Sequence, residues 1–171
     1  MTRDETAPEP DGAPDSVVSP EIEAGSPAER AQAVRCGSRW IAFPYGWARG
    51  AVERVPLSKV PGAPAWLAGA ANVEGRIVPV IDLLAWSLPG QAVDSESKGA
   101  RLLVGGDGED TVAVLFEGLP RAVHVVRQAA LRADGDRLAA YAFGYELDDA
   151  NTLALDAPRW VEALIEELAP R

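Results

Sequence analysis

The stretch Pro64-Ala-Trp-Leu-Ala-Gly-Ala-Ala-Asn-Val-Glu-Gly-Arg-Ile-Val-Pro-Val-Ile-Asp82 decides the fold class of this 171-residue chain. Residues 66–71 predict a short apolar helical turn, and a glycine-containing turn follows it. Residues 76–82 predict a strand buried on both faces, because they are mostly apolar and β-branched. Pro79 has no N–H to donate, so it indicates an edge position or a bulge. Two packed faces and one free edge suit a small barrel with an exposed docking edge.

Three polar or glycine residues of this stretch are expected to shape a loop rather than to contact a substrate. The Asn72 amide can bond nearby backbone and hold the turn that precedes Gly75. Gly75 is expected to adopt a conformation that a Cβ would disfavour. Asp82 can cap a helical turn over residues 83–88 by accepting backbone N–H groups.

Short strands and turns fill the rest of the chain. Residues 34–36 and 39–43 predict two strands joined by a two-residue turn at Gly37-Ser38, since glycine tolerates positive φ. One further short strand is expected within residues 47–57. The remaining strands are predicted at 102–104, 111–116, 122–126, 141–146 and 152–155, with loops at 89–100, 105–110, 128–139 and 148–151.

The last element is a predicted amphipathic helix. Asp156 suits the N-cap position, and Pro158 is tolerated in the first helical turn. One helix face carries all the large apolar side chains, and we expect this face to pack on the barrel. Its members are Trp160, Val161, Leu164, Ile165 and Leu168.

Residues 60–83 resemble the signature of the CheW-type coupling proteins of bacterial chemosensory systems. The matching positions are Pro64, Trp66-Leu67, Gly69, Asn72, Gly75 and the strand Ile77 to Ile81 with Pro79, followed by Asp82-Leu83. The resemblance covers about residues 31–168 and is closest to the members that serve type IV pilus systems. It implies a mainly β fold with two small SH3-like five-stranded β-barrel subdomains packed together and a C-terminal α-helix. Residues 31–171 would form this domain.

The resemblance also implies a non-enzymatic adaptor without cofactor or metal. Such an adaptor couples the tip of a methyl-accepting chemoreceptor to the regulatory domain of a CheA-like histidine kinase, in chemotaxis or pilus motility. Kinase contacts in the family lie on the strand before the proline-rich connector, where Val52 and Glu53 are the nearest match if the connector is shortened. A gapless alignment instead places Gly50 at the acidic position. The candidate protein-binding residues are Val52, Glu53, Asn72, Glu74, Gly75 and Trp47, the last as a partly exposed aromatic anchor.

One residue departs from the family pattern. Glu74 stands where the family usually has Arg, and a carboxylate only accepts hydrogen bonds whereas a guanidinium only donates them. A first alternative is therefore a diverged CheW-like protein that binds a different partner or positions signalling arrays. A second alternative is a hydrolytic or small-ligand-binding β-barrel that uses Asp82 and His124. His124 alternates with two valines in a predicted strand, so an exposed strand histidine is the simpler interpretation.

Composition excludes several other classes. The formal net charge is −10, which disfavours nucleic acid and anionic membrane surfaces as partners. The single cysteine, Cys36, excludes a disulfide framework and a cysteine-based metal cluster, and we expect it to be buried. No run approaches the ~18 apolar residues of a membrane span, and the N-terminus lacks a signal-peptide core. These observations predict a cytoplasmic protein, and the resemblance to CheW-type proteins implies a location at membrane-associated receptor arrays.

Residues 1–30 are expected to form a disordered acidic tail. They hold eight acidic residues, two basic residues and five prolines, with few large apolar side chains. Such a segment cannot bury enough apolar surface to offset the entropy cost of ordering it.

Deleting residues 1–28 is therefore expected to leave the thermal unfolding midpoint nearly unchanged, as measured by circular dichroism. A drop of several degrees would show that the tail packs on the body.

Overall fold

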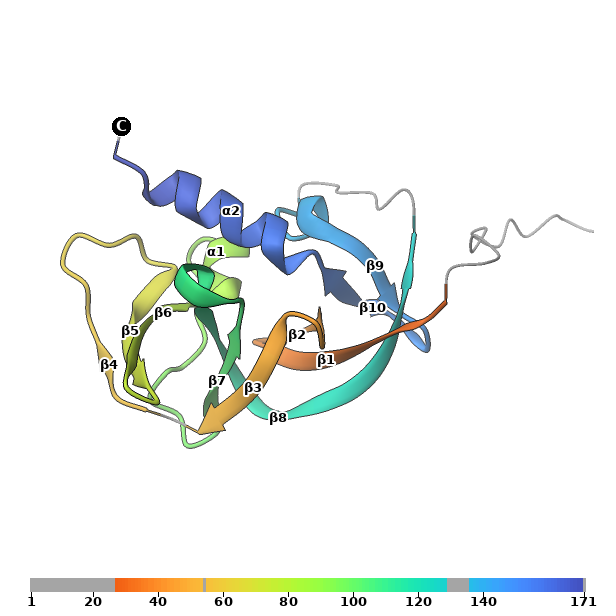
Figure 1. Ribbon diagram of the computed structural model, residues 1–171, viewed down its shortest axis with the longest axis horizontal. Coiled ribbons are helices and arrows are strands. Elements are labelled where there is room, and N and C mark those ends of the chain that lie inside the picture. The colour runs from red at the N-terminus through yellow and green to blue at the C-terminus, as the bar shows by residue number, and fades with distance from the viewer. Residues whose placement is uncertain (1–26, 54, 129–135, 171) are drawn as a thin grey trace, which may run out of the picture.

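The computed structural model describes residues 27–53, 55–128 and 136–170 (Figure 1). The predicted acidic tail therefore lies outside the described residues, apart from its last four positions. The first strand begins at Glu29, which is five residues before the first predicted strand at 34–36. Most of the predicted irregular segment 128–139 also lies outside the described residues.

The described residues form ten strands, two α-helices and two short 3₁₀ turns. The strands are β1 (Glu29–Cys36), β2 (Arg39–Pro44), β3 (Ala48–Glu53), β4 (Leu57–Ser58), β5 (Leu67–Val73), β6 (Arg76–Ile81), β7 (Ala100–Gly105), β8 (Val112–Arg127), β9 (Ala142–Glu146) and β10 (Asp149–Leu155). The helices are α1 (Leu83–Ser87) and α2 (Ala157–Leu168), and the 3₁₀ turns are η1 (Gly108–Asp110) and η2 (Ala139–Tyr141).

Five strands close into a ring, which we call the closed barrel. Its order is β1, β2, β10, β9 and the C-terminal half of β8, which pairs back with β1. The two-residue turn at Gly37-Ser38 is confirmed, because Cys36 pairs with Arg39. The turn between β9 and β10 is shorter than predicted, since Glu146 pairs with Asp149.

The N-terminal half of β8 belongs to a second subdomain, which we call the open barrel. Its order is β3, β7, β8, β6, β5 and the two-residue β4. No pairing joins β3 to β4 within the described residues, so each of these strands has a free edge. The two subdomains confirm the mainly β architecture with a C-terminal helix.

The single long strand β8 is a correction to the sequence analysis, which predicts two strands at 111–116 and 122–126. The backbone stays extended through the intervening residues and passes from one barrel to the other (Figure 1). Gly118 permits the change of direction, since its φ is +79°. Its N–H donates to the Gly99 carbonyl at 2.9 Å, which ties the bend to the chain before β7.

The predicted helical turn at residues 66–71 is wrong, because this segment forms strand β5. It pairs with β6 on one side and with β4 on the other. At Gly69 the β4 backbone comes so close that a Cβ would lie 2.7 Å from the Ser58 carbonyl oxygen. Small residues permit this approach, and sheet pairing outweighs the weak helical preference of the alanines.

Strand β6 is buried on both faces only near its end. Val78, Val80 and Ile81 are almost fully buried, whereas 72% of Ile77 is exposed. The reason is the register: β8 pairs with β6 only at Val80 and Ile81, so the start of β6 has β5 as its single neighbour. Pro79 lies in that singly paired part, which agrees with its expected edge position.

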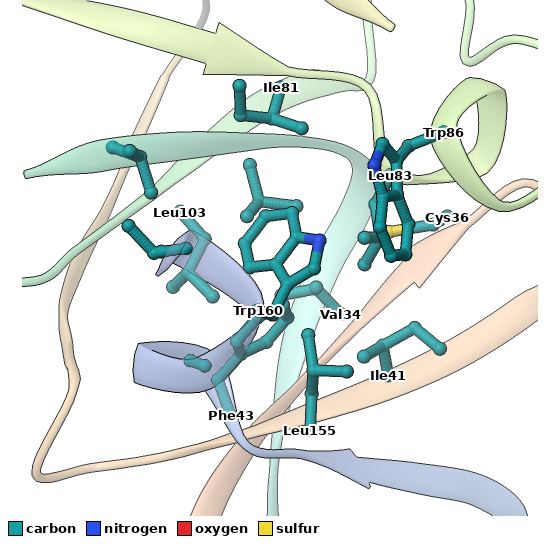
Figure 2. Packing of buried hydrophobic residues seen from close by; sticks show 14 of the residues in the cluster. Val34, Cys36, Ile41, Phe43, Ile81, Leu83, Trp86, Leu103, Leu155 and Trp160 are labelled. Atoms are coloured by element: carbon teal, nitrogen blue, oxygen red, sulfur yellow. The ribbon is translucent and has the colours of Figure 1, made fainter. Parts of the chain in front are cut away.

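Three apolar clusters hold the fold together. One lies inside the open barrel and consists of Ala71, Val78, Val80, Leu84, Val93, Ala100, Leu102, Ala113 and Leu115. A small one, mainly alanine and valine, lies inside the closed barrel. The largest lies between the barrels, because it joins side chains of both strand sets with those of α1 and α2. Figure 2 shows Trp160 of α2 at its centre, with Val34, Phe43, Leu103 and Leu155 around it.

Helix α2 is capped as the sequence predicts, but only part of its apolar face is covered. The Asp156 carboxylate accepts from the Arg159 N–H at 3.3 Å. Trp160, Val161 and Leu164 are buried, whereas 52% of Ile165 and 46% of Leu168 are exposed. The expectation that the whole face packs on the barrel is therefore wrong for its last two members.

We expect Leu164→Ala to lower the free energy of unfolding by about 2–5 kcal/mol, because it opens a cavity between the barrels. The matched change Ile165→Ala, one residue further along α2, should cost less than about 1 kcal/mol. Urea denaturation followed by tryptophan fluorescence measures both. Equal costs would contradict the partial coverage of α2.

Candidate protein-binding site

The hairpin between β5 and β6 ends in a tight two-residue turn. Val73 pairs with Arg76, and the two residues between them have φ angles of +51° (Glu74) and +83° (Gly75). Two successive positive φ angles are the pattern of a type I′ hairpin turn. The Gly75 N–H donates to Asn72 Oδ1 at 2.9 Å. The turn-holding roles predicted for Asn72 and Gly75 are confirmed.

We call four of the exposed residues of this hairpin, Asn72, Glu74, Gly75 and Ile77, the docking rim. Ile77 pairs with Asn72 across the hairpin and is among the most exposed large apolar side chains of the described chain. The sequence analysis places Ile77 in the core because it belongs to an apolar run. Every residue from Ile77 to Ile81 is apolar, so no alternation in the sequence marks Ile77 as exposed, and its exposure follows from the limited pairing of β6 with β8.

A cavity of about 270 Å³ separates the docking rim from the β7–β8 loop. Arg76 crosses it and donates to the Gly108 carbonyl at 2.8 Å. Arg49, at the start of β3, pairs with Asp107 and donates to the Gly106 carbonyl. These bonds fasten the hairpin and β3 to the same loop, so the position of the docking rim is fixed by the body of the protein.

Val52 and Glu53 lie on β3 but do not line this cavity, which is bordered by the other end of the strand. Val52 pairs with Leu102, is half-buried and packs against the cluster inside the open barrel. Glu53 pairs with Arg101 and is exposed on the strand with the free edge. The predicted binding residues therefore lie in two places, on the docking rim and on the free-edged strand β3.

The expected exposure of Trp47 is wrong, because only 7% of this residue is accessible. Its indole stacks on Phe43 with ring centroids 5.1 Å apart. It also covers Gly105 so closely that a Cβ there would lie 2.3 Å from the indole ring. A glycine at the end of β7 creates the space for the indole, and nothing local to Trp47 reveals it.

The structure does not bring Asp82 and His124 together. Asp82 is 3% exposed, and its carboxylate accepts from the N–H groups of Ala85 at 3.0 Å and Val93 at 2.8 Å. Burial raises the pKa of this carboxyl against the lowering effect of those bonds. His124 is exposed on β8, and no hydrogen bond described for Asp82 reaches it. The capping role of Asp82 is confirmed.

Cys36 is buried as expected, and burial raises the pKa of its thiol to about 12. The thiol therefore stays protonated at neutral pH and is a poor nucleophile. Over the described parts of the chain, no cluster of three histidine, cysteine or acidic side chains is arranged to hold a metal ion. No helix in the same parts is both long enough and apolar enough to span a bilayer.

The family of this domain follows from its sequence match to a known protein family. A family model described as the CheW-like domain matches residues 31–163. The chain belongs to the CheW-like domain family. Residues 31–163 include every strand except the first two residues of β1, together with the docking rim and the start of α2.

A solved structure supports the fold of this CheW-like domain. It is the crystal structure of the scaffolding protein TtCheW from Thermoanaerobacter tengcongensis, with a TM-score of 0.61 and 16% sequence identity. The match covers 75% of this chain and 89% of that chain. A search of the curated proteins found no match.

Glu74 has a backbone conformation that is unfavourable for its residue type. Among the described residues it is the one non-glycine with positive φ. Asn is much better tolerated there, and Asn-Gly is a preferred type I′ pair. Glu74→Asn should therefore raise the free energy of unfolding by about 0.5–1 kcal/mol in urea denaturation.

Glu109→Asn, an equal change at an exposed residue of the β7–β8 loop, is the control and should not stabilise the chain. The turn assignment would be wrong if both variants had the same stability.

Proposed function

We propose that this chain is a non-enzymatic adaptor that couples methyl-accepting chemoreceptors to a CheA-like histidine kinase. CheW-like domains are scaffold modules of chemotaxis signalling, and this chain belongs to that family. The observation that carries the proposal is the docking rim, which presents exposed polar and apolar side chains on a hairpin fastened to the barrel. The proposed location is the receptor array. The sequence resemblance to members of type IV pilus systems supports pilus motility as the output.

The free edge of β3 offers a second kind of contact. Its unpaired backbone groups can add to a strand of another protein, and Glu53 stands exposed on it. We propose that the kinase regulatory domain contacts this edge, since Val52 and Glu53 are the nearest match to the strand that carries kinase contacts in the family. The two sites would let one rigid body hold two partners.

An adaptor of this kind changes kinase activity only through differential binding. It must contact the kinase regulatory domain more favourably in one activity state than in the other, or the equilibrium does not shift. Arg76 and Asn72 hold the docking rim rigidly, so a change in one partner is transmitted rather than absorbed by a flexible loop.

The test uses the purified chain with the kinase regulatory domain and the receptor tip encoded in the same genome. Isothermal titration calorimetry should show binding to at least one of them. Ile77→Ser should weaken that binding about tenfold, because it removes an exposed apolar contact from the docking rim. Leu147→Ser changes a 52% exposed leucine in the β9–β10 turn and should have no effect.

Absence of binding to both partners would overturn the proposal. Equal effects of Ile77→Ser and Leu147→Ser would overturn the assignment of the docking rim.

A second candidate function is a diverged adaptor for a different partner, favoured by the acidic Glu74 in place of the usual arginine. Glu74→Arg distinguishes the two, with Glu109→Arg as the control for charge. If Glu74→Arg lowers affinity for the cognate partner, Glu74 belongs to an adapted interface of the same kind. If it raises affinity, the usual family contact has been lost in this chain.

A further inference from the structure

The apolar stripe of α2 continues beyond the body that it packs on. Val161, Ile165 and Leu168 are spaced by four and three residues, so they share one helix face. Val161 is buried, but about half of Ile165 and of Leu168 is exposed. Within the part of the chain that the structure describes, the last turn of α2 therefore presents an unpartnered apolar face.

A groove lies at the foot of this face and has a volume of about 200 Å³. Its apolar lining comes from the edge of Trp47 and from α2, where Pro158, Val161 and Ile165 contribute. Trp47 is held in place by its stack on Phe43, so the groove floor is rigid. The exposed α2 stripe and the groove together form one continuous apolar surface, which we call the α2 groove.

Acidic side chains border the α2 groove. Asp107 and Asp110 of the β7–β8 loop stand on one side, and Glu162 of α2 stands on the other. Asp107 pairs with Arg49, whereas Asp110 and Glu162 have no ion-pair partner among the described residues. An occupant that carries positive charge beside its apolar side chains would meet both free carboxylates.

Charge also argues against two occupants from within this protein. Residues 1–26 carry seven acidic residues and one basic residue, so they would be repelled by the carboxylates that border the α2 groove. A second copy of the chain brings a formal net charge of −10. The exposed part of the stripe, Ile165 and Leu168, covers about one turn of α2. The groove extends the apolar surface toward Pro158 and Trp47, so a second helix can lie along both.

We propose that the α2 groove binds a basic amphipathic helix of another protein. This interaction is separate from the docking rim, because the cavity beside the rim shares only Gly106 and Asp107 with the α2 groove. The α2 groove would be a third contact surface of the chain, beside the docking rim and the free edge of β3.

The test uses a 14-residue amidated peptide with Leu at positions i, i+3, i+4 and i+7 and Lys on the opposite face. Titration into the ¹⁵N-labelled full chain at about 0.15 M salt is followed by NMR. We expect a Kd below about 100 µM. The largest shifts should fall on the amides of Gly106, Asp110, Val161 and Ile165.

Matched variants separate the α2 groove from general attraction to an acidic protein. The pair Asp110→Asn and Glu162→Gln should raise the Kd about fivefold. The control pair Glu109→Gln and Glu166→Gln removes the same charge from the same two elements outside the groove and should leave the Kd within about twofold. Ile165→Ser should raise it about tenfold, and Leu147→Ser should not.

Three results would overturn the proposal. These are no binding up to about 1 mM peptide, equal effects of the two charge pairs, and amide shifts centred on a surface other than the α2 groove.

Discussion

The burial of Trp160 between the two barrels is the interaction on which the rest of the structure depends. Its side chain is fully buried where both strand sets, α1 and α2 meet. Trp86 meets it edge-to-face with ring centroids 6.2 Å apart, and Phe43 lies at 6.4 Å. The Trp160 N–H has no hydrogen-bond acceptor among the described residues, and Figure 2 shows it on the side facing Trp86. Such aromatic contacts stabilise beyond their area alone and fix orientation.

The contacts of Arg137 with Trp86 and Glu167, which we call the polar clasp, fix the position of α2 against this aromatic centre. The Arg137 guanidinium lies 3.9 Å from the Trp86 ring centroid and donates to the Trp86 carbonyl at 3.2 Å. It also pairs with Glu167 of α2, which accepts from the Trp86 indole N–H at 3.3 Å. Because α2 is fixed at both its cap and this clasp, its exposed Ile165 stays beside the Trp47 floor. The position of the α2 groove thus follows from the packing of Trp86 and Trp160.

Local signals predicted the elements that depend on neighbours in sequence. The Gly37-Ser38 hairpin, the Asp82 and Asp156 caps and the Asn72–Gly75 turn all form as expected, because each involves residues within four positions of one another. The same local signals failed for residues 66–71, where a weak helical preference competes with pairing to β4 and β6. They also failed at Trp47, whose burial depends on Gly105, which lies far along the chain.

The sequence by itself determined the many short strands, the terminal helix, the turns and, through residues 60–83, the family resemblance, since turn chemistry and apolar periodicity are local. Only the tertiary structure decided which apolar residues stay exposed. Ile77 lies outside the core because β8 reaches only Val80 and Ile81, and Ile165 lies outside it because the barrels end before α2 does. Burial depends on where other elements stop, and that is a property of strand register and helix packing, which no single stretch of sequence encodes.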